Sequence, residues 1–207
     1  CIDMKIILIG AGNLATQLAV ALQKKGMTPA YIYSRTRKSA EQLSERLRDV
    51  PHSTDISRVP TDGDLYIFAV KDSALLDLVS RMPANRGLWV HTAGSMDMEV
   101  FAPYTARYGV FYPMQTFSKE RETDFDDIPI FVEANHTDDT ERLQELAGRL
   151  STKVYEATSE QRKYLHLAAV FACNFSNHLY ALCDRILSEH GLPFETMLPL
   201  IRETAAK

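Results

Sequence analysis

The residues best suited to chemistry lie in a glycine-rich turn near the N-terminus. Gly10, Gly12 and Ala15 follow the apolar run of residues 5–9 in a Gly-x-Gly-x-x-Ala pattern, and a helical pattern begins directly after them. In such a turn the first glycine permits a tight bend, the second lets the backbone approach a pyrophosphate, and the free N–H groups at the helix start attract phosphate. A turn without a ligand is the alternative, but the flanking strand and helix favour a dinucleotide site. Its predicted residues are Gly10, Gly12, Asn13 and Leu14.

The second predicted strand, residues 30–34, ends in a basic segment. A protein that binds NAD places Asp or Glu at this point to hydrogen-bond the ribose 2′-hydroxyl. The segment Ser34-Arg-Thr-Arg-Lys38 has no carboxylate; its hydroxyls can hydrogen-bond a 2′-phosphate and its arginines can neutralise one. This favours NADP(H) over NAD as the cofactor, although a solvated basic helix start is the alternative. The predicted contacts are Ser34, Arg35, Thr36 and Arg37.

Three further strand ends supply candidate contacts, because ligands of open parallel sheets lie outside the carboxyl ends of the strands. Residues 65–70 lead into a polar turn, and residues 88–91 lead into small residues close to where a nicotinamide ring would lie. For His91 a buried, hydrogen-bonded structural role is an equal alternative. The predicted cofactor contacts are Val70, Lys71, His91, Thr92, Ala93 and Gly94. The predicted substrate contacts, which follow the next strand, are Tyr112, Gln115 and Thr116.

The elements that must position these residues alternate between strands and helices. Short apolar runs predict the strands, and apolar residues at helical spacing predict the helices between them. The alternation indicates an α/β fold class: a Rossmann-type, mostly parallel sheet with helices on both faces. The predicted strands are residues 5–9, 30–34, 65–70, 88–91, 109–111, 130–133 and 153–156, and the predicted helices are residues 14–22, 38–47, 73–81 and 138–150.

The chain changes character after Glu156. A capping sequence, Thr158-Ser-Glu-Gln161, starts a segment with no glycine or proline until Gly191, which predicts one long helix. A second helix begins near Pro193 and shows no stop signal before Lys207, so we expect a truncated helical region. The predicted domains are residues 1–156, a dinucleotide-binding domain, and residues 157–207, an all-helical dimerisation and substrate domain.

The long helix is apolar on nearly every side, as a helix buried in a dimer would be, yet it carries four polar residues. At about 100° per residue all four fall within an arc of roughly 120°, so they can face one cleft. Structural hydrogen bonding at an interface is an equal alternative for the first two and the favoured interpretation of the last two. The four are His166, Asn174, Asn177 and His178.

Composition argues against several classes of partner. The 207 residues carry a net charge of −4, which gives no basic surface for nucleic acid or an anionic membrane. The most apolar run, residues 165–175, is too short to cross a bilayer, and no metal site is expected because His, Cys, Asp and Glu lack the spacing of one. The cysteines Cys1, Cys173 and Cys183 form no CxxC motif, which indicates a reducing, cytoplasmic setting. The expected ligand is a small molecule.

Four segments carry a resemblance to a known family: Gly10-Ala-Gly-Asn-Leu-Ala15, His91-Thr-Ala-Gly94, Tyr112-Pro-Met-Gln-Thr-Phe117 and residues 164–175. In this order they resemble bacterial Rossmann-like proteins with a C-terminal domain of unknown function, DUF2520. That family is provisionally described as NADP oxidoreductases and is similar in architecture to pyrroline-5-carboxylate reductase and the 6-phosphogluconate dehydrogenase superfamily. The resemblance implies NADP(H) as cofactor and a homodimer formed through the C-terminal helices. The chain departs from the family pattern at one position of the third segment. The family usually has a histidine before the proline there, whereas this chain has Tyr112.

Reduction of an imine or carbonyl needs a hydride from the cofactor and a proton donor near the acceptor atom. The resemblance implies that the helical domain supplies the donor, so we expect His166 and Asn174 to be catalytic and Asn177 to contact the substrate. The β-hydroxyacid dehydrogenases of the superfamily use a lysine four residues before an asparagine on this helix. Here Val170 precedes Asn174 and Cys173 precedes Asn177, which disfavours alcohol oxidation of that type.

The expected function is therefore that of an NADP-dependent oxidoreductase that transfers a hydride between NADPH and a small imine or carbonyl substrate, similar to pyrroline-5-carboxylate reductase. The alternative is a non-catalytic NADP-binding sensor or interaction protein. Tyr112 and the missing lysine are the features of the sequence that favour this alternative.

Overall fold

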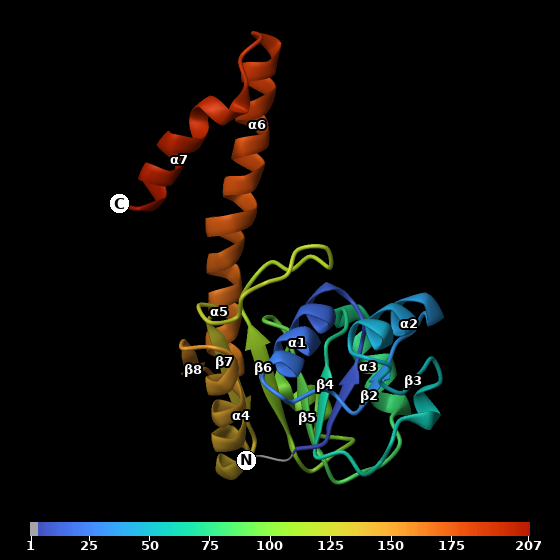
Figure 1. Ribbon diagram of the computed structural model, residues 1–207. Helices are drawn as coiled ribbons and strands as arrows, with labels where there is room; N and C mark the ends of the chain where they lie inside the picture. The colour runs from blue at the N-terminus through green and yellow to red at the C-terminus, as the bar shows by residue number, and fades with distance from the viewer. Residues whose placement is uncertain (1–3) are drawn as a thin grey trace. The chain divides into compact units, whose positions relative to one another are not determined.

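The structure is a computed structural model that describes residues 4–207 (Figure 1). Cys1 lies outside the described residues. The chain divides into two compact units, of which the first ends at Lys163 and the second is Tyr164–Lys207. The first unit is α/β and the second is helical, as the sequence predicts. The division falls after the predicted boundary at Glu156, because the first turn of the following helix packs with the α/β unit.

One eight-stranded sheet forms the centre of the first unit, in the order β3-β2-β1-β4-β5-β6-β7-β8. The pairs from β3 to β6 are parallel, β6 and β7 are antiparallel, and β7 and β8 are parallel. The mostly parallel sheet of the predicted fold class is thereby confirmed. The strands are β1 (Ile6–Ile9), β2 (Tyr31–Tyr33), β3 (His52–Ser53), β4 (Leu65–Phe68), β5 (Leu88–His91), β6 (Tyr108–Pro113), β7 (Ile130–Ala134) and β8 (Val154–Glu156).

Helices cover both faces of the sheet, and each face has its own hydrophobic core. Successive residues of β1 alternate between the two cores: Ile6 and Leu8 pack in one, and Ile7 and Ile9 in the other. Because both faces are buried, the strands appear in the sequence as continuous apolar runs. One core takes side chains from α1 (Asn13–Lys24), α2 (Arg37–Arg46) and α4 (Thr137–Leu150), and the other from α3 (Asp72–Arg81) and the 3₁₀ turns η1 (Ile56–Arg58) and η2 (Met98–Phe101).

The sheet contains one strand and one strand direction that the sequence did not predict. β3 has only two residues, His52 and Ser53, which is too short for a hydrophobic pattern to mark. β7 runs antiparallel to β6 because the connection between them, residues 114–129, contains no helix. An antiparallel neighbour needs no crossover helix, whereas a parallel one does.

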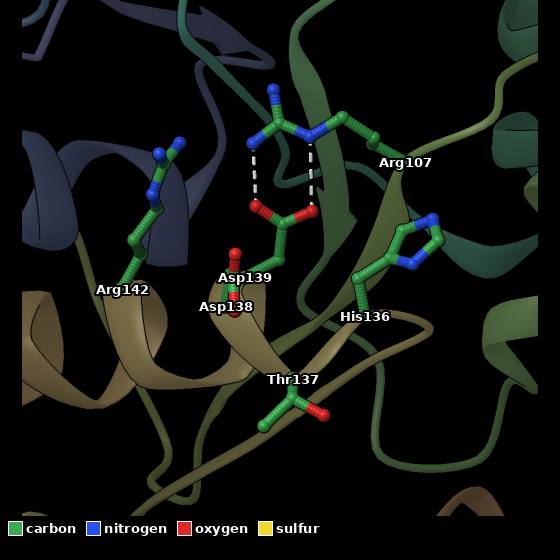
Figure 2. A pocket seen from close by; sticks show the side chains of 6 residues that line it. All are labelled: Arg107, His136, Thr137, Asp138, Asp139 and Arg142. Atoms are coloured by element: carbon green, nitrogen blue, oxygen red, sulfur yellow. Dashed lines mark hydrogen bonds and ion pairs between the residues drawn. The ribbon is translucent and has the colours of Figure 1, made fainter.

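An ion pair fastens the start of α4 to the amino end of β6 (Figure 2). Arg107 Nε and Nη2 lie 3.0 and 2.5 Å from the two carboxylate oxygens of Asp139, whose side chain is buried. His136, Thr137 and Arg142 are among the residues that line the hollow around this pair. The central charges of this hollow neutralise one another, and it lies at the amino ends of the strands, so it is not where the parallel sheet would bind a nucleotide.

The helical unit is held together by very little packing of its own. Helix α5 (Ser159–Ala169) continues through a π-helical segment, η3 (Val170–Phe175), into α6 (Ser176–Glu189), which confirms the predicted long helix. A 3₁₀ turn, η4 (Phe194–Met197), and α7 (Leu198–Ala205) follow. No residue of η3, α6, η4 or α7 is buried. Over residues 4–207 no helix is both long and apolar enough to cross a membrane.

The first turn of α5 is anchored in the α/β unit by a buried arginine. Arg162 is fully buried and forms an ion pair with Glu133 of β7. Its Nη2 also donates to the carbonyl oxygen of Met96 at 2.8 Å and to Ser159 Oγ at 3.2 Å. Ser159 Oγ in turn donates to Glu133 at 2.8 Å. This network explains why the first unit extends to Lys163.

β5 ends at a histidine whose ring is buried. His91 is 1% exposed; its Nδ1 accepts from the backbone N–H of Ala93 at 3.2 Å, and its Nε2 lies 3.2 Å from the carbonyl oxygen of Asp97. A neutral ring that carries its proton on Nε2 satisfies both contacts. Burial, assisted by the positive charge of Arg162, lowers the pKa of His91 from 6.5 to about 4. The geometry favours the structural interpretation of this side chain, since neither ring nitrogen is left for a ligand.

The buried His91 should make the fold sensitive to mild acid. Between pH 7 and pH 4.5 the unfolded chain binds a proton at this residue, with a pKa of 6.5, whereas the folded chain, with a pKa of about 4, largely does not. Stability is therefore lost as the pH falls, and we expect His91 to account for about 2.5 kcal/mol of the loss. Urea unfolding of the wild type and of His91→Gln at both pH values measures this. An equal loss in the two proteins would contradict the expectation.

Candidate cofactor-binding site

The reversal of strand order between β1 and β4 opens a crevice at the carboxyl ends of the strands. β1 lies between β2 and β4, α1 follows β1 on one face of the sheet, and α3 follows β4 on the other. Ligands of open α/β sheets bind at such a point. A cavity of about 620 Å³ lies here. It is lined by Gly10, Ala11, Gly12, Tyr33, Ser34, Arg35, Thr36, Ser39, Ala69, Val70, Lys71, Ser73, Ala74, Asp77, Leu78, Arg81 and Lys119.

Gly10 is required by the close approach of two backbones. Its φ of +124° lies in the region that side chains rarely adopt, and a Cβ at this position would lie 2.3 Å from the carbonyl oxygen of Ala69. Its N–H donates to the carbonyl oxygen of Tyr33 at 2.7 Å. Gly10 therefore joins the end of β1 to the ends of both neighbouring strands, which the fold needs whether or not a ligand binds.

Gly12 differs from Gly10, because the protein leaves room for a side chain at this position. A Cβ at Gly12 would meet no atom within 4 Å. Gly12 is the N-cap of α1, which has no side-chain cap and no acidic residue in its first turn. The first N–H groups of α1 thus lack an intrahelical partner. An open glycine beside free N–H groups is the arrangement that lets a phosphate approach the backbone.

The charged residues of the cavity are mainly cationic. Among the described residues, four cations line it together with one carboxylate, Asp77, which lies 3.0 Å from Arg81 on the same helix. Among residues 4–207 the other three cations, Arg35, Lys71 and Lys119, have no carboxylate within 4 Å. Three unpaired cations around an uncapped helix start create a positive potential, which favours a ligand with several negative charges.

The structure brings together about half of the predicted cofactor contacts. Those that line the cavity are Gly10, Gly12, Ser34, Arg35, Thr36, Val70 and Lys71; those that do not are Asn13, Leu14, Arg37, His91, Thr92, Ala93 and Gly94. Asn13 Nδ2 instead donates to the carbonyl oxygen of Phe117 at 3.1 Å, and Arg37 pairs with Glu41 at 2.7 Å. For the seven residues outside the cavity lining, a role in cofactor binding stays a prediction, because their backbone groups can still contact a ligand.

Several lining residues were missed by reasoning from the sequence. Ser73, Asp77 and Arg81 recur every four residues on α3, so they share one helix face that lies along the cavity. The helix start at the polar turn after β4 is the signal that could have identified this face. Lys119 lies in the connection between β6 and β7, where no local pattern points to the cavity.

Tyr112, a predicted substrate contact, lies at the carboxyl end of β6. It is half-buried, and a Cβ built on Gly94 would lie 2.9 Å from its hydroxyl oxygen. Its ring lies against Phe131, with 6.3 Å between the ring centroids. Burial raises the pKa of Tyr112 above its ordinary value of 10.0. The phenol is therefore protonated at neutral pH and lies beside the turn after β5; the other two predicted contacts, Gln115 and Thr116, are exposed.

The predicted catalytic residues lie in the helical unit, where all four polar residues of the long helix are exposed. The π-helical segment changes their angular positions, because such a segment adds about one residue to a regular helix and rotates the residues after it by about 100°. His178, rather than Asn177, then falls within about 20° of His166, and Asn177 moves to about 80° away. The angular positions expected for an unbroken α-helix therefore do not apply beyond Ala169. Asn174 lies within the π segment itself.

The metal-ligating side chains are scattered. Within the described part of the chain, no group of three or more His, Cys, Asp or Glu residues is arranged to hold a metal ion. Cys173 and Cys183 are both free, and Cys173 is exposed within the chain.

Substitutions at the two glycines of the turn should distinguish an effect on stability from an effect on cofactor binding. Gly12→Ala meets open space, so we expect its free energy of unfolding to stay within about 1 kcal/mol of the wild type, while the added methyl group blocks a phosphate and weakens NADPH binding at least about tenfold. Gly10→Ala should lose about 2 kcal/mol or more of stability, because its φ and its contact with Ala69 are both violated. Thermal unfolding and NADPH titration of both variants test this. Normal binding by Gly12→Ala would show that no phosphate lies at this turn.

Two protein-family models match the chain, one in its N-terminal part and one in its C-terminal part. A Rossmann-like domain model matches residues 2–114, and the model of the domain of unknown function DUF2520 matches residues 128–207. The second match begins before β7, so it includes the last two strands of the sheet as well as the helical unit. A comparison with curated proteins gave no significant match.

Solved structures agree with these matches. BF3122 from Bacteroides fragilis, provisionally named an NADP oxidoreductase, is 51% identical with a TM-score of 0.88, over 99% of this chain and 80% of that one. A reductive aminase from Aspergillus terreus in complex with NADPH (17% identity, TM-score 0.78, covering 98% and 72%) and a pyrroline-5-carboxylate reductase from Coxiella burnetii (16%, 0.72, covering 98% and 77%) share the fold. The chain belongs to the family of proteins that join a Rossmann-like domain to a DUF2520 domain.

Proposed function

We propose that the chain binds NADP(H) in the cavity beside Gly10 and Gly12 and transfers a hydride between NADPH and a small imine or carbonyl substrate. The observation that carries the proposal is the combination of an uncapped helix start, an open glycine and unpaired cations at the point where the strand order reverses. A dinucleotide phosphate supplies the negative charge that this arrangement lacks. When bound, the nicotinamide would supply the hydride.

The end of β2 favours NADP over NAD. Ser34, Arg35 and Thr36 line the cavity, and no carboxylate stands among them to accept a bond from a ribose 2′-hydroxyl. Arg35 has no ion-pair partner among the described residues, so its guanidinium is free for a 2′-phosphate. The provisional name of the Bacteroides fragilis protein and the NADPH held by the reductive aminase support the same cofactor.

The imine or carbonyl substrate class rests on the chain's own residues and on its relatives' reactions. The lysine that would mark a β-hydroxyacid dehydrogenase is absent before Asn174 and Asn177. A reductive aminase and a pyrroline-5-carboxylate reductase share the fold. Tyr112, protonated at neutral pH, is suited to donate a hydrogen bond or a proton to the acceptor atom. His166 and Asn174 remain the predicted donors in the helical unit, with Asn177 at the substrate.

We also propose that the protein is a homodimer formed through the C-terminal helices, in the cytoplasm, where free cysteines such as Cys173 and Cys183 persist. Large apolar side chains form a stripe along α5, η3 and α6, each at least half exposed: Tyr164 (67%), Leu167 (52%), Phe171 (61%), Phe175 (50%), Leu179 (57%) and Ile186 (59%). A unit of this size with no buried side chains beyond α5 cannot form a core alone. A second copy presents the same stripe, so a two-fold interface is self-complementary.

The dimer proposal can be tested at two adjacent rings. Phe171 and Phe175 lie next to each other within the stripe, with 5.1 Å between ring centroids and 45° between ring planes. We expect the wild type to be dimeric in size-exclusion chromatography with light scattering, and Phe171→Asp/Phe175→Asp to be monomeric because each carboxylate would be buried at the interface. Leu76→Asp, at an exposed leucine of α3 (55%), is the matched control and should stay dimeric. A monomeric wild type would refute the proposal.

Cofactor choice is tested by calorimetric titration with NADPH and NADH. We expect the wild type to prefer NADPH by about tenfold or more. Arg35→Glu should weaken NADPH far more than NADH, because a repulsive carboxylate replaces the partner of the 2′-phosphate. Arg58→Glu is the matched control, because Arg58 of η1 is exposed and lies outside the cavity. Equal effects of Arg35→Glu on both cofactors would place the 2′-phosphate elsewhere.

Turnover separates the proposed enzyme from its alternative. Steady-state assays with NADPH over a panel of cyclic imines, ketones with amines, and 2-oxo acids should show NADPH oxidation with at least one class. Tight cofactor binding without any turnover would favour a non-catalytic NADP-binding sensor. Absence of dinucleotide binding would contradict both the oxidoreductase and the NADP-binding sensor.

A further inference from the structure

The connection between β6 and β7 is packed onto α1. We call residues 114–128 the strap; in Figure 1 it includes the yellow-green loop next to α1. Phe117 of the strap stacks on Phe125, with 5.6 Å between ring centroids and 22° between ring planes, and Phe125 is part of the hydrophobic core. Glu122 forms an ion pair with Lys24 at the end of α1. The strap is therefore a folded element with its own packing.

A buried glutamine of α1 holds the middle of the strap. Gln17 is 1% exposed; its Nε2 donates to the carbonyl oxygen of Ser118 at 2.6 Å, and its Oε1 accepts from the backbone N–H of Thr123 at 3.1 Å. Asn13, one turn earlier, donates to the carbonyl oxygen of Phe117. Both side chains satisfy backbone groups of the strap. The bonds of Gln17 are part-buried, so its removal would leave polar groups that are shielded from water without partners.

These contacts fix the backbone of Lys119 beside the cofactor cavity. Its carbonyl oxygen accepts from Arg46 Nη1 of α2 at 3.0 Å, so both α1 and α2 hold this part of the strap. Lys119 is one of the residues that line the same cavity as Gly10 and Gly12. No acceptor or carboxylate of the described chain pairs with its ammonium group.

An unpaired lysine at this position has an electrostatic cost in the free protein. It shares the cavity with Arg35 and Lys71 and with the positive end of the α1 dipole. Like charges in one cavity repel, and Asp77, the one carboxylate among the described lining residues, is paired with Arg81. A ligand phosphate would remove this repulsion, because it provides the counter-charge that the protein does not.

We propose that Lys119 binds a phosphate of the dinucleotide, and that Gln17 is a positioning residue that holds the strap so that the ammonium group reaches it. The inference rests on the proposed NADP(H) site and adds to it a phosphate contact from outside the glycine turn and the strand ends. The proposal also gives a role to the buried side chain of Gln17, although Gln17 is not among the residues that line the cavity.

The test compares two cations of the strap. Arg121 is exposed and lies outside the cavity, so Arg121→Ala removes the same charge from the same segment as Lys119→Ala. We expect Lys119→Ala to weaken NADPH binding roughly tenfold, as loss of a charged hydrogen bond does, and Arg121→Ala to change it less than about twofold. Lys119→Arg should retain most of the affinity. An equal effect of the two alanine variants, or none from Lys119→Ala, would overturn the proposal.

The same titrations locate the phosphate. A loss for NADPH and NADH alike places Lys119 at the diphosphate, and a loss for NADPH alone places it at the 2′-phosphate; either supports the contact. If wild-type protein binds neither cofactor, the proposed function fails and this inference with it. If the wild type binds NADPH and Lys119 has no specific effect, the inference alone fails.

The positioning role of Gln17 has a separate readout. Gln17→Ala should increase amide hydrogen exchange in residues 118–123 and weaken NADPH binding, and these effects should be absent from Gln23→Ala on the same helix. Because Gln17 acts through Lys119, the double variant with Lys119→Ala should bind NADPH about as weakly as Lys119→Ala alone. Fully additive losses would show that Gln17 acts by another route.

Discussion

The candidate cofactor cavity of this protein depends on one close backbone contact, at Gly10. The end of β1 approaches the end of β4 so closely that a Cβ would lie 2.3 Å from the carbonyl oxygen of Ala69, and the Gly10 N–H is also bonded to the end of β2. Three strand ends therefore converge on one residue. The chain must turn at this point, and α1 starts immediately afterwards with its N–H groups unpaired and its N-cap open. The cavity, its free donors and its positive potential all follow from that turn.

The distribution of charge differs between the cavity and the end of β5. Around the glycine turn the unpaired cations Arg35, Lys71 and Lys119 favour a polyanion. At the end of β5, by contrast, the pKa of His91 is lowered to about 4 by burial, so its ring is neutral at physiological pH. Under the proposed function this difference is useful, because the nicotinamide gains positive charge when it gives up a hydride. A protonated imidazole near that end would oppose the charge, whereas a neutral one does not.

The sequence predicts the parts of the site that a short segment encodes. The turn at Gly10, the basic end of β2 and the polar turn after β4 each lie within a few residues of a strand, and the structure brings them to one cavity. The strap and the Arg162 network could not be found in this way, because each depends on contacts between residues far apart in the chain. Gln17, for example, bonds residues more than a hundred positions away. The direction of β7 and the π segment were missed for a related reason, since neither changes the hydrophobic pattern that marks an element.

The two units differ in how far their own packing holds their side chains in place. The α/β unit has a core on each face of its sheet and fixes even distant loops through buried polar groups such as Gln17 and Arg162. Beyond α5 the helical unit has no buried residue, although it carries Asn174 and Asn177. Side chains on such a surface are not held in one geometry until another surface covers the helices, and a catalytic group must be held in place to act. Under the proposed function, cofactor binding is thus a property that one chain can have alone, whereas any proton transfer from the long helix would depend on the proposed dimer. The half-buried Tyr112 needs no such assembly, because the α/β unit alone fixes its ring against Phe131.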